Sequence, residues 1–317
     1  MNQQTMRIGD PTMSDTGPGT RPLVSIVMPT YNRAHLVGQA LEAVLGQTYS
    51  NLEIIIVNDG SRDGSREVLD EYARRDSRVR VIHKENEGIP ETVNRGWRES
   101  RGKYVTWTSD DNLYHPTAIE VMVGFLESHG DVALTYTDCR HIDGDGSVIG
   151  FPAGQEPHVL ENGCPIAGCL LFRREVFDKI EMFRREWTRC HDFDFYHRVY
   201  KAYPVTRIPE VLYDYRVHAE SMSGNEWAII TEHARLLTSY SNSWTERRGI
   251  WGVCWAEIAR QGSRQNKPWK SVWYLFRAAM HQPFRLPQFW RALWIACYGL
   301  VPGPLQHCWR SLKRNCG

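Results

Sequence analysis

Residues 23–61 read LVSIVMPTYNRAHLVGQALEAVLGQTYSNLEIIIVNDGS and decide the fold of this chain. The apolar runs LVSIVM and LEIIIV are separated by a stretch from Ala34 to Gln47 that is amphipathic. Short apolar runs joined by a segment of helical length are typical of a strand, a helix and a second, parallel strand. The segment therefore predicts one βαβ unit.

The same alternation continues toward the middle of the chain. A helical stretch at 65–76 precedes the run VRVIH, a second at 88–100 precedes a strand pattern at 104–107, and Pro116 suits the start of a helix that runs to His129. Right-handed crossovers of this length place helices on both faces of a mostly parallel sheet. The sequence therefore predicts an α/β fold.

Beyond the run VALTYT the regular alternation ends. Residues 143–146 carry a hairpin signal, CPIAGCLLF predicts a buried strand, residues 174–180 and 191–203 predict helices, and VLYDYRVH predicts a last strand. Residues 1–21 are polar and aperiodic, which indicates a disordered leader. We therefore expect a leader at 1–21, a main domain at 22–224 and a helical extension at 225–317.

The extension differs from the rest of the chain in charge and in tryptophan content. Residues 225–317 carry 13 Lys and Arg against 4 Asp and Glu, residues 1–224 carry 25 against 33, and nine of the twelve tryptophans lie in the extension. This pattern suits peripheral contact with an anionic membrane, although a tryptophan-rich core with a solvated basic face would share it. The charge-free run 292–309 offers about ten usable apolar residues, fewer than the roughly 20 of a spanning helix.

The eight cysteines form no CxxC pair, and the chain opens without the pattern of a secretory signal. Both observations predict reduced thiols in a cytoplasmic protein. The extension could hold such a protein on the inner face of the cell membrane. We expect no nucleic-acid partner.

Polar residues follow the ends of the predicted strands, where open parallel sheets bind their ligands. PTYNR follows the first strand, NDGS the second and SDDN the fourth, whereas the glycine-rich phosphate-binding loops GxGxxG and GxxxxGK[ST] do not occur. The adjacent carboxylates of Asp110 and Asp111 are suited to hold Mg²⁺ or Mn²⁺ while substrate phosphates supply further oxygens. They predict a metal-assisted diphosphate site, with an acidic helix start ahead of Pro116 as the structural alternative.

Together these motifs resemble the inverting glycosyltransferases of family 2, which have the GT-A fold. The resemblance rests on PTYNR, QTYSNLEIIIVNDGSRDGS, RGKYVTWTSDDN and CHDFDFYHRV, and it covers residues 22–224. It implies a nucleotide-sugar donor, by family habit a UDP-sugar, a bound Mn²⁺ or Mg²⁺ ion, and transfer with inversion at the anomeric carbon. The acceptor would be a glycan, a lipid-linked oligosaccharide or a small molecule, as in polysaccharide or glycoconjugate biosynthesis.

The resemblance also assigns roles to individual residues. It implies that Tyr31 lies against the nucleobase, that Asp59 accepts a hydrogen bond from the base or the ribose, and that Asp110 lies near the ribose and the donor sugar. The implied metal ligands are Asp111 and His218. Further donor-side positions are Pro29, Arg33 and Gly168, where a glycine permits close approach to the strand, with Arg216 and Ser221 near the phosphates.

The general base must act on the face of the sugar opposite the departing diphosphate, and the resemblance assigns that role to Asp192. Two departures from the family pattern occur: His191 precedes Asp192 where an acidic residue is usual, and Thr108 stands where many members have a further Asp. A neighbouring imidazole could keep Asp192 ionised by charge or by hydrogen bonding. Asp194 is the rival base, and on a helix at most one of the two aspartates faces the cleft.

Each assignment has a structural alternative. Tyr31 could cover the core, Asp59 could stabilise its turn, Asp192 could cap a helix, and His218 could be a hydrogen-bonded structural group. At the level of function, one alternative is a sugar nucleotidyltransferase, which the missing glycine-rich loop after the first strand disfavours. The other is a catalytically silent scaffold or binding subunit, which intact Asp110, Asp111 and Asp192 disfavour.

Overall fold

The computed structural model describes residues 21–161, 163–218 and 226–241. The strands are β1 (Val24–Thr30), β2 (Leu52–Asp59), β3 (Val79–Lys84), β4 (Tyr104–Trp107), β5 (Leu113–Tyr114), β6 (Leu134–Ile142), β7 (Val148–Gly150), β8 (Leu170–Arg173) and β9 (Val205–Arg216). The helices are α1 (Val37–Leu45), α2 (Ser65–Arg75), α3 (Ile89–Glu99), α4 (Ala118–Ser128), α5 (His191–Ala202) and α6 (Glu226–Tyr240), with 3-10 helices η1 (Pro157–Glu161) and η2 (Arg174–Asp178).

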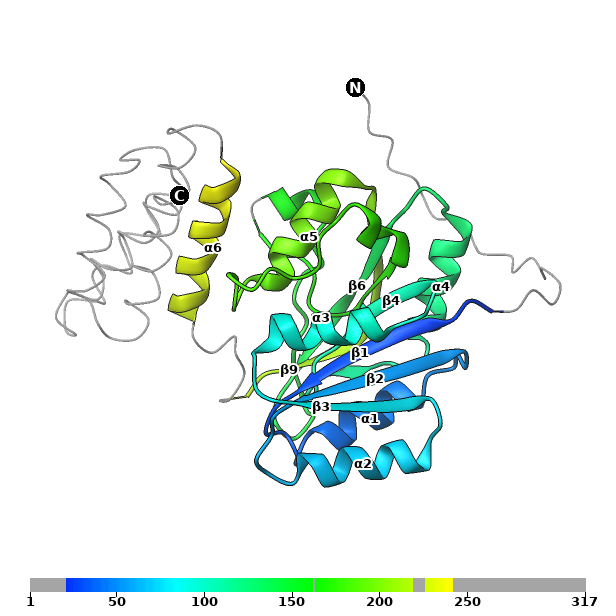
Figure 1. The fold of residues 1–317 in the computed structure, drawn as a ribbon. Coiled ribbons are helices and arrows are strands. Elements are labelled where there is room, and N and C mark those ends of the chain that lie inside the picture. Colours follow the sequence, from blue (N-terminus) through cyan, green and yellow to red (C-terminus); the bar gives the residue numbers. More distant parts are fainter. Residues whose placement is uncertain (1–20, 162, 219–225, 242–317) are drawn as a thin grey trace, which may run out of the picture.

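The strands form one sheet in the order β3-β2-β1-β4-β8-β6-β9-β5, and β7 pairs with β6 (Figure 1). β1 runs parallel to β2 and β4, and β2 runs parallel to β3, which confirms the predicted βαβ units. Beyond β4 the sheet is mixed, because β8 is antiparallel to both β4 and β6 whereas β6 and β9 are parallel. The expected parallel pairing therefore describes the first four strands.

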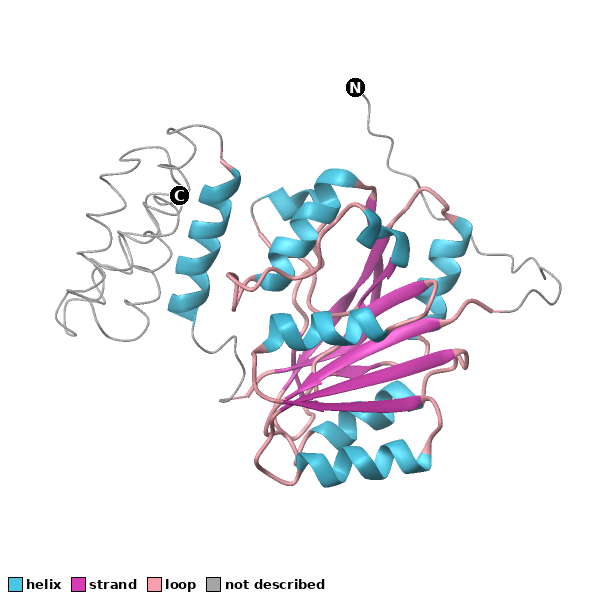
Figure 2. Cartoon of the chain, viewed as in Figure 1, coloured by secondary structure: helices cyan, strands magenta, loops and turns pink. Residues whose placement is uncertain are grey.

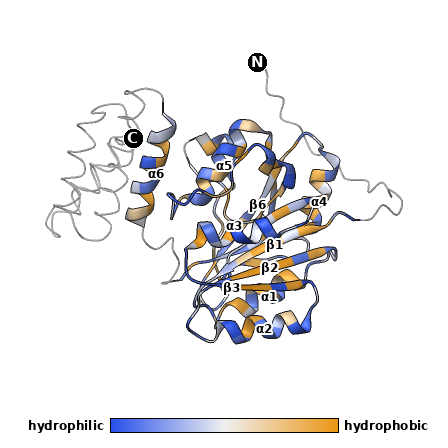
Figure 3. Ribbon diagram, in the orientation of Figure 1, coloured by the Kyte–Doolittle hydropathy of each residue, from blue (hydrophilic) through white to orange (hydrophobic). Residues whose placement is uncertain are grey.

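Alternate side chains of the central strands enter two separate cores. Ile26 and Met28 pack in a cluster with α1, α2 and α4, whereas Val27 packs in a cluster with α3 and α5 on the other face. Successive side chains of a strand point to opposite faces, so a strand that is covered twice is apolar throughout. Figure 2 shows helices on both faces of the sheet, and Figure 3 shows the hydrophobic strands between them.

Two predicted strands differ from the observed ones. In the run 164–172 only the residues from Leu170 onward are strand, because Gly168 has a φ of 115° and the residues before it form a loop. β9 begins at Val205 instead of Val211 and passes through Pro209, where the register against β6 shifts. A proline lacks the N–H that a ladder needs, so the irregularity accommodates it.

The structure describes only residues 226–241 of the predicted extension, and α6 lies there beside α5 (Figure 1). Within the described ranges no helix is long and apolar enough to cross a membrane. The cysteines at 139, 164, 169 and 190 are free thiols. The predicted leader up to residue 20, Ser221, the tryptophan stripes from residue 251 onward and the other four cysteines lie outside the described residues.

Candidate active site

A cavity of about 930 Å³ lies at the carboxyl ends of β1, β2 and β4, where a parallel sheet is expected to bind its ligand. Its wall brings together the predicted donor-side residues, the acid pair and the predicted base: Pro29, Tyr31, Arg33, Asp59, Asp110, Asp111, Gly168 and Asp192. These residues come from strand ends, loops and the start of α5, which are far apart in the sequence. The sheet order therefore gathers the predicted site in one place.

The two predicted metal ligands meet beside this cavity. Nε2 of His218 lies 3.0 Å from Oδ2 of Asp111, and the Ser109 hydroxyl donates to Oδ1 at 2.5 Å. A carboxylate oxygen and an imidazole nitrogen are both suitable ligands for Mn²⁺. No three His, Cys, Asp or Glu side chains converge on one point in the described part of the chain. An ion held by Asp111 and His218 would thus need oxygens from a bound substrate or from water.

Asp110 is buried next to the backbone N–H of Tyr31. Burial raises the pKa of Asp110 to about 7, the charge of Asp111 adds to the effect, and Arg33 opposes it. A positive charge or a donated hydrogen bond at this carboxylate would favour its ionised form. The position is consistent with the expected contact near the ribose and the donor sugar.

Asp59 is held by three donors of its own chain. Nζ of Lys84 at 2.5 Å and the N–H of Glu87 at 2.9 Å contact Oδ1, and the N–H of Gly88 at 2.9 Å contacts Oδ2. Burial would raise the pKa of Asp59, but the Lys84 and backbone hydrogen bonds outweigh it and hold the pKa below its usual range. Asp59 therefore organises the loop ahead of α3, and its contact with a nucleotide stays a prediction.

The two motifs PTYNR and NDGSRDGS are tied to each other. The N–H of Asn32 donates to Oγ of Ser61 at 2.9 Å, and the N–H of Arg62 donates to Oδ1 of Asn32 at 2.8 Å. Asn32 has a φ of 52°, a left-handed conformation that asparagine tolerates better than most residues. Tyr31, next to Asn32, is 44% exposed and lines the cavity. The residues that make these hydrogen bonds belong to the two motifs, but the sequence alone did not show which groups they contact.

Gly168 has a structural partner that the sequence did not predict. A Cβ at this position would lie 3.1 Å from Oη of Tyr213, and that hydroxyl shares a hydrogen bond of 2.8 Å with Thr108. The close approach is thus to a buried tyrosine, and Gly168 lies in a loop before β8 and not in a strand. Thr108, which replaces the family's further Asp, is held by the same tyrosine.

The Arg216 side chain, 2% exposed, supports the loop that carries Asp111. Its Nε donates to the Asp111 carbonyl at 2.9 Å, and its Nη2 donates to Gln39 at 2.9 Å. Nη1 donates to the carbonyls of Asp143 and Gly144 at 3.2 and 2.7 Å. Four of the five N–H groups of a guanidinium are therefore used on neutral oxygens of the protein. Arg216 is therefore a brace that also lines the cavity, and its expected contact with phosphates stays a prediction.

The first turn of α5 separates the two candidate bases. Asp192 lines the cavity, and its Oδ1 accepts the N–H of Phe193 at 2.8 Å. Asp194 is fully buried away from the cavity wall, where Arg198 donates to it at 2.7 and 3.0 Å and the Tyr240 hydroxyl also donates to it. The expectation that at most one of the two aspartates faces the cleft is confirmed, and that residue is Asp192.

His191 does not assist Asp192 in the way the sequence suggested. Its ring packs against Trp107 and Phe183, and its Nδ1 faces the Thr188 carbonyl at 3.3 Å. Burial lowers the pKa of His191, so the imidazole is neutral near pH 7. The prediction that the His191 imidazole keeps Asp192 ionised, by charge or by a hydrogen bond, is therefore wrong.

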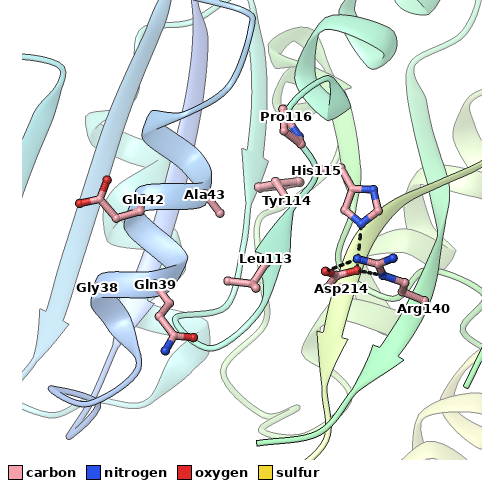
Figure 4. Close-up of a pocket in the computed structure, with 10 residues that line it drawn as sticks. All are labelled: Gly38, Gln39, Glu42, Ala43, Leu113, Tyr114, His115, Pro116, Arg140 and Asp214. Carbon is pink, nitrogen blue, oxygen red and sulfur yellow. Dashed lines mark hydrogen bonds and ion pairs between the residues drawn. The ribbon is translucent and has the colours of Figure 1, made fainter. Parts of the chain in front are cut away.

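A second hollow, of about 850 Å³, lies between α1 and the end of β9 (Figure 4). Three of its polar groups are paired with one another: Nε2 of His115 lies 2.9 Å and Nε of Arg140 2.5 Å from Oδ1 of Asp214. Glu42, which also lines the hollow, pairs with Arg75. None of the predicted site residues lines this hollow. We therefore place the active site in the first cavity.

Comparisons with known proteins concern the family and the fold of this chain. The model of glycosyl transferase family 2 matches residues 25–181. An uncharacterized glycosyltransferase of Rickettsia prowazekii is 29% identical over 247 residues, which cover 72% of this chain and 74% of the relative.

Two solved structures share the fold. S. aureus TarS 1–349 in complex with UDP-GlcNAc has a TM-score of 0.60 at 15% identity and covers 91% of each chain. The mannosyltransferase PcManGT of Pyrobaculum calidifontis, in complex with GDP-Man and Mn²⁺, has a TM-score of 0.56 at 18% identity and covers 93% of this chain and 84% of its own. By its matched segment, its relatives and its fold, this chain is a glycosyltransferase of family 2 with the GT-A fold.

Proposed function

We propose that this enzyme transfers a sugar from a UDP-sugar to an acceptor hydroxyl, with inversion and with the help of Mn²⁺ or Mg²⁺. The observation that carries the proposal is one cavity that holds Asp111, in contact with His218, and also Asp192 on a different element. UDP-GlcNAc in TarS and GDP-Man with Mn²⁺ in PcManGT support a nucleotide-sugar donor and a metal.

On the donor side, the exposed ring of Tyr31 would stack on the nucleobase. Asp59 and Asp110 would accept hydrogen bonds from the base or the ribose. Asp111 and His218 would hold the ion, which when bound supplies positive charge for the leaving diphosphate. Ser109 and Arg216 would keep Asp111 in place.

On the acceptor side, Asp192 would take the proton from the acceptor hydroxyl as its oxygen attacks the anomeric carbon. The new C–O bond forms as the bond between that carbon and the diphosphate oxygen breaks, and the bonding electrons leave with the diphosphate. The displacement is direct, so the product has the inverted configuration and no covalent enzyme intermediate forms.

A ligand panel followed by turnover tests this proposal. We expect UDP to stabilise the protein against heat in the presence of Mn²⁺ and not in excess chelator, by about 2.7 kcal/mol at a UDP concentration of 100 Kd. Release of UDP from UDP-sugars should require the same ion, and mass spectrometry of the products identifies the sugar and the acceptor. UDP release that continues undiminished in excess chelator would contradict metal dependence.

The same panel addresses the other functions. A scaffold would bind no nucleotide, and a sugar nucleotidyltransferase would form nucleoside triphosphate from the sugar nucleotide and pyrophosphate. The glycan, lipid-linked or small-molecule nature of the acceptor, a cytoplasmic location and membrane contact by residues 225–317 stay predictions. Liposome binding by the full chain, compared with a chain that ends before the tryptophan stripes, would check the last of these.

A further inference from the structure

Helix α6 holds the residues directly before the turn that carries Asp192. The Glu232 carboxylate of α6 accepts the N–H of Arg189 at 2.7 Å and the N–H of Cys190 at 3.2 Å. Cys190 is the N-cap residue of α5, and its side chain makes no capping hydrogen bond. These two N–H groups directly precede the first turn of α5, and a carboxylate near a helix N-terminus is stabilising. Glu232 therefore ties α6 to the residues that lead into α5.

The same helix also forms part of the cavity wall. Ile229 and His233 lie one turn apart on α6, and both line the cavity that Asp192 lines. The Ile229 carbonyl is 3.7 Å from Sγ of Cys190, and the ring of His233 packs on Phe193 with centroids 4.4 Å apart. All of these contacts are with the segment that presents the proposed base.

Three residues that line this cavity carry a buried polar atom without a hydrogen-bond partner in the described part of the chain. These atoms are Nε2 of His233, Nε2 of His191 and Oγ1 of Thr30. Burying a polar nitrogen without a hydrogen bond is costly. The packing of α6 itself comes from Leu236, which belongs to the hydrophobic core, and from Ile229, Leu237 and Tyr240, which pack against that core. The ring of His233 packs on Phe193 and its Nε2 atom is buried, so the histidine borders the cavity with its ring.

We propose that α6 is the acceptor-side wall of the active site. Glu232 is a positioning residue that holds the turn of Asp192, and Ile229 and His233 contact the acceptor and determine which acceptor is used. The inference rests on the proposed function, because it takes Asp192 to mark the end of the cavity where the acceptor hydroxyl arrives. It extends the catalytic unit past the boundary expected at residue 224.

The test uses the full chain and five single variants: Ile229→Ala, His233→Ala, Glu232→Ala, Glu232→Gln and, as the matched control, Arg235→Ala. Arg235 is exposed on the same helix, two residues from His233. Binding of UDP with Mn²⁺ is measured by calorimetry. Turnover is measured as UDP release from a panel of UDP-sugars, first into water and then with a panel of mono- and disaccharides as acceptors.

We expect Ile229→Ala and His233→Ala to leave the Kd for UDP unchanged and to raise the KM for the preferred saccharide roughly tenfold, as removal of one contact in a specificity pocket does. Glu232→Ala should lower kcat about tenfold, in the water reaction as well, because Asp192 is displaced. Glu232→Gln should recover most of this loss, since its amide oxygen still accepts N–H bonds. Arg235→Ala should match the wild type.

Several outcomes would overturn the inference while leaving the proposed function intact. They are wild-type acceptor kinetics in both Ile229→Ala and His233→Ala, equal impairment of Glu232→Gln and Glu232→Ala, and no acceleration of UDP release by any saccharide. A wild-type chain that fails to bind UDP with Mn²⁺ would instead remove the proposed function itself. If Glu232→Ala does not fold, the Glu232→Gln and Ile229→Ala variants still decide the matter.

Discussion

His218 and Asp111 meet across 107 residues of sequence, with Nε2 of one 3.0 Å from Oδ2 of the other. The short strand β5 makes this possible, because it begins two residues after Asp111 and pairs antiparallel with β9, Leu113 with Asp214 and Tyr114 with Tyr213. β9 ends at Arg216, so His218 emerges beside the acid pair. Two residues of strand pairing thus bring the proposed metal ligands together.

Loss of either member of this pair should weaken nucleotide binding only when Mn²⁺ is present. Asp111→Ala is expected to abolish Mn²⁺-dependent UDP binding and turnover, and His218→Ala should weaken UDP binding by about 10- to 100-fold. Calorimetry with UDP measures both effects. In excess chelator the two variants and the wild type should bind UDP alike, and metal-dependent binding by Asp111→Ala at wild-type strength would contradict the assignment.

Asp192→Asn should separate donor binding from chemistry. Asparagine has the shape of aspartate but cannot take up the acceptor proton, so kcat should fall by about 10²- to 10⁴-fold while the Kd for UDP stays unchanged. Steady-state UDP release and calorimetry measure the two quantities. Wild-type turnover by this variant would show that Asp192 is not the base.

Asp194→Asn should reduce stability by about 3 kcal/mol, because it leaves the buried guanidinium of Arg198 without its carboxylate. Unfolding in urea gives this free energy. Glu181→Gln is the control, since Glu181 is 70% exposed and its ion pair with Arg184 should contribute less than about 1 kcal/mol. A variant that is stable yet inactive would make Asp194 a candidate for the chemistry.

Gly168→Ala should destabilise the protein by about 1–3 kcal/mol. A residue with a side chain is strained at a φ of 115°, and its Cβ would press on the hydroxyl of Tyr213. Gly124→Ala is the matched control, because that glycine is exposed within α4 and its Cβ would meet nothing within 4 Å; there alanine should stabilise by roughly 0.5–1 kcal/mol. Equal unfolding free energies for the two variants would refute the argument.

Asp214 should make stability depend on pH in the acid range (Figure 4). Burial would raise the pKa of Asp214, but hydrogen bonds from Arg140 and His115 outweigh it and hold the pKa below its usual range. The unfolded chain therefore takes up this proton first, so the stabilisation is present above the unfolded pKa of about 3.9 and is lost as pH falls through the folded pKa. The free energy of unfolding of Asp214→Asn, measured in urea, should fall less steeply than that of the wild type as the pH drops below about 5. If the unfolding free energies of the two proteins fall in parallel with pH, the hydrogen bonds of Asp214 contribute nothing to acid unfolding.

The boundaries of the N-terminal elements were predictable to within a few residues. The helix expected at 65–76 spans Ser65–Arg75, and the strand expected at 104–107 spans Tyr104–Trp107. The periodicity of apolar residues was informative here, because the buried residues of a helix or strand recur at a fixed spacing. The strand boundaries of the second half were harder to predict. Gly168 lies in the loop before β8, and Pro209 lies where the register of β9 against β6 shifts.

What the sequence determined by itself was the set of βαβ units, the acid pair at a strand end and the aspartates from which the base would come, because each is a local pattern of apolar and polar residues. Only the tertiary structure decided that Asp192 faces the cavity while Asp194 is buried, that Arg216 braces the Asp111 loop, and that Glu232 binds the backbone ahead of α5. These contacts join segments that are distant in the chain. Their energies depend on which groups the packed sheet and helices bring within hydrogen-bond distance, and no local pattern encodes that.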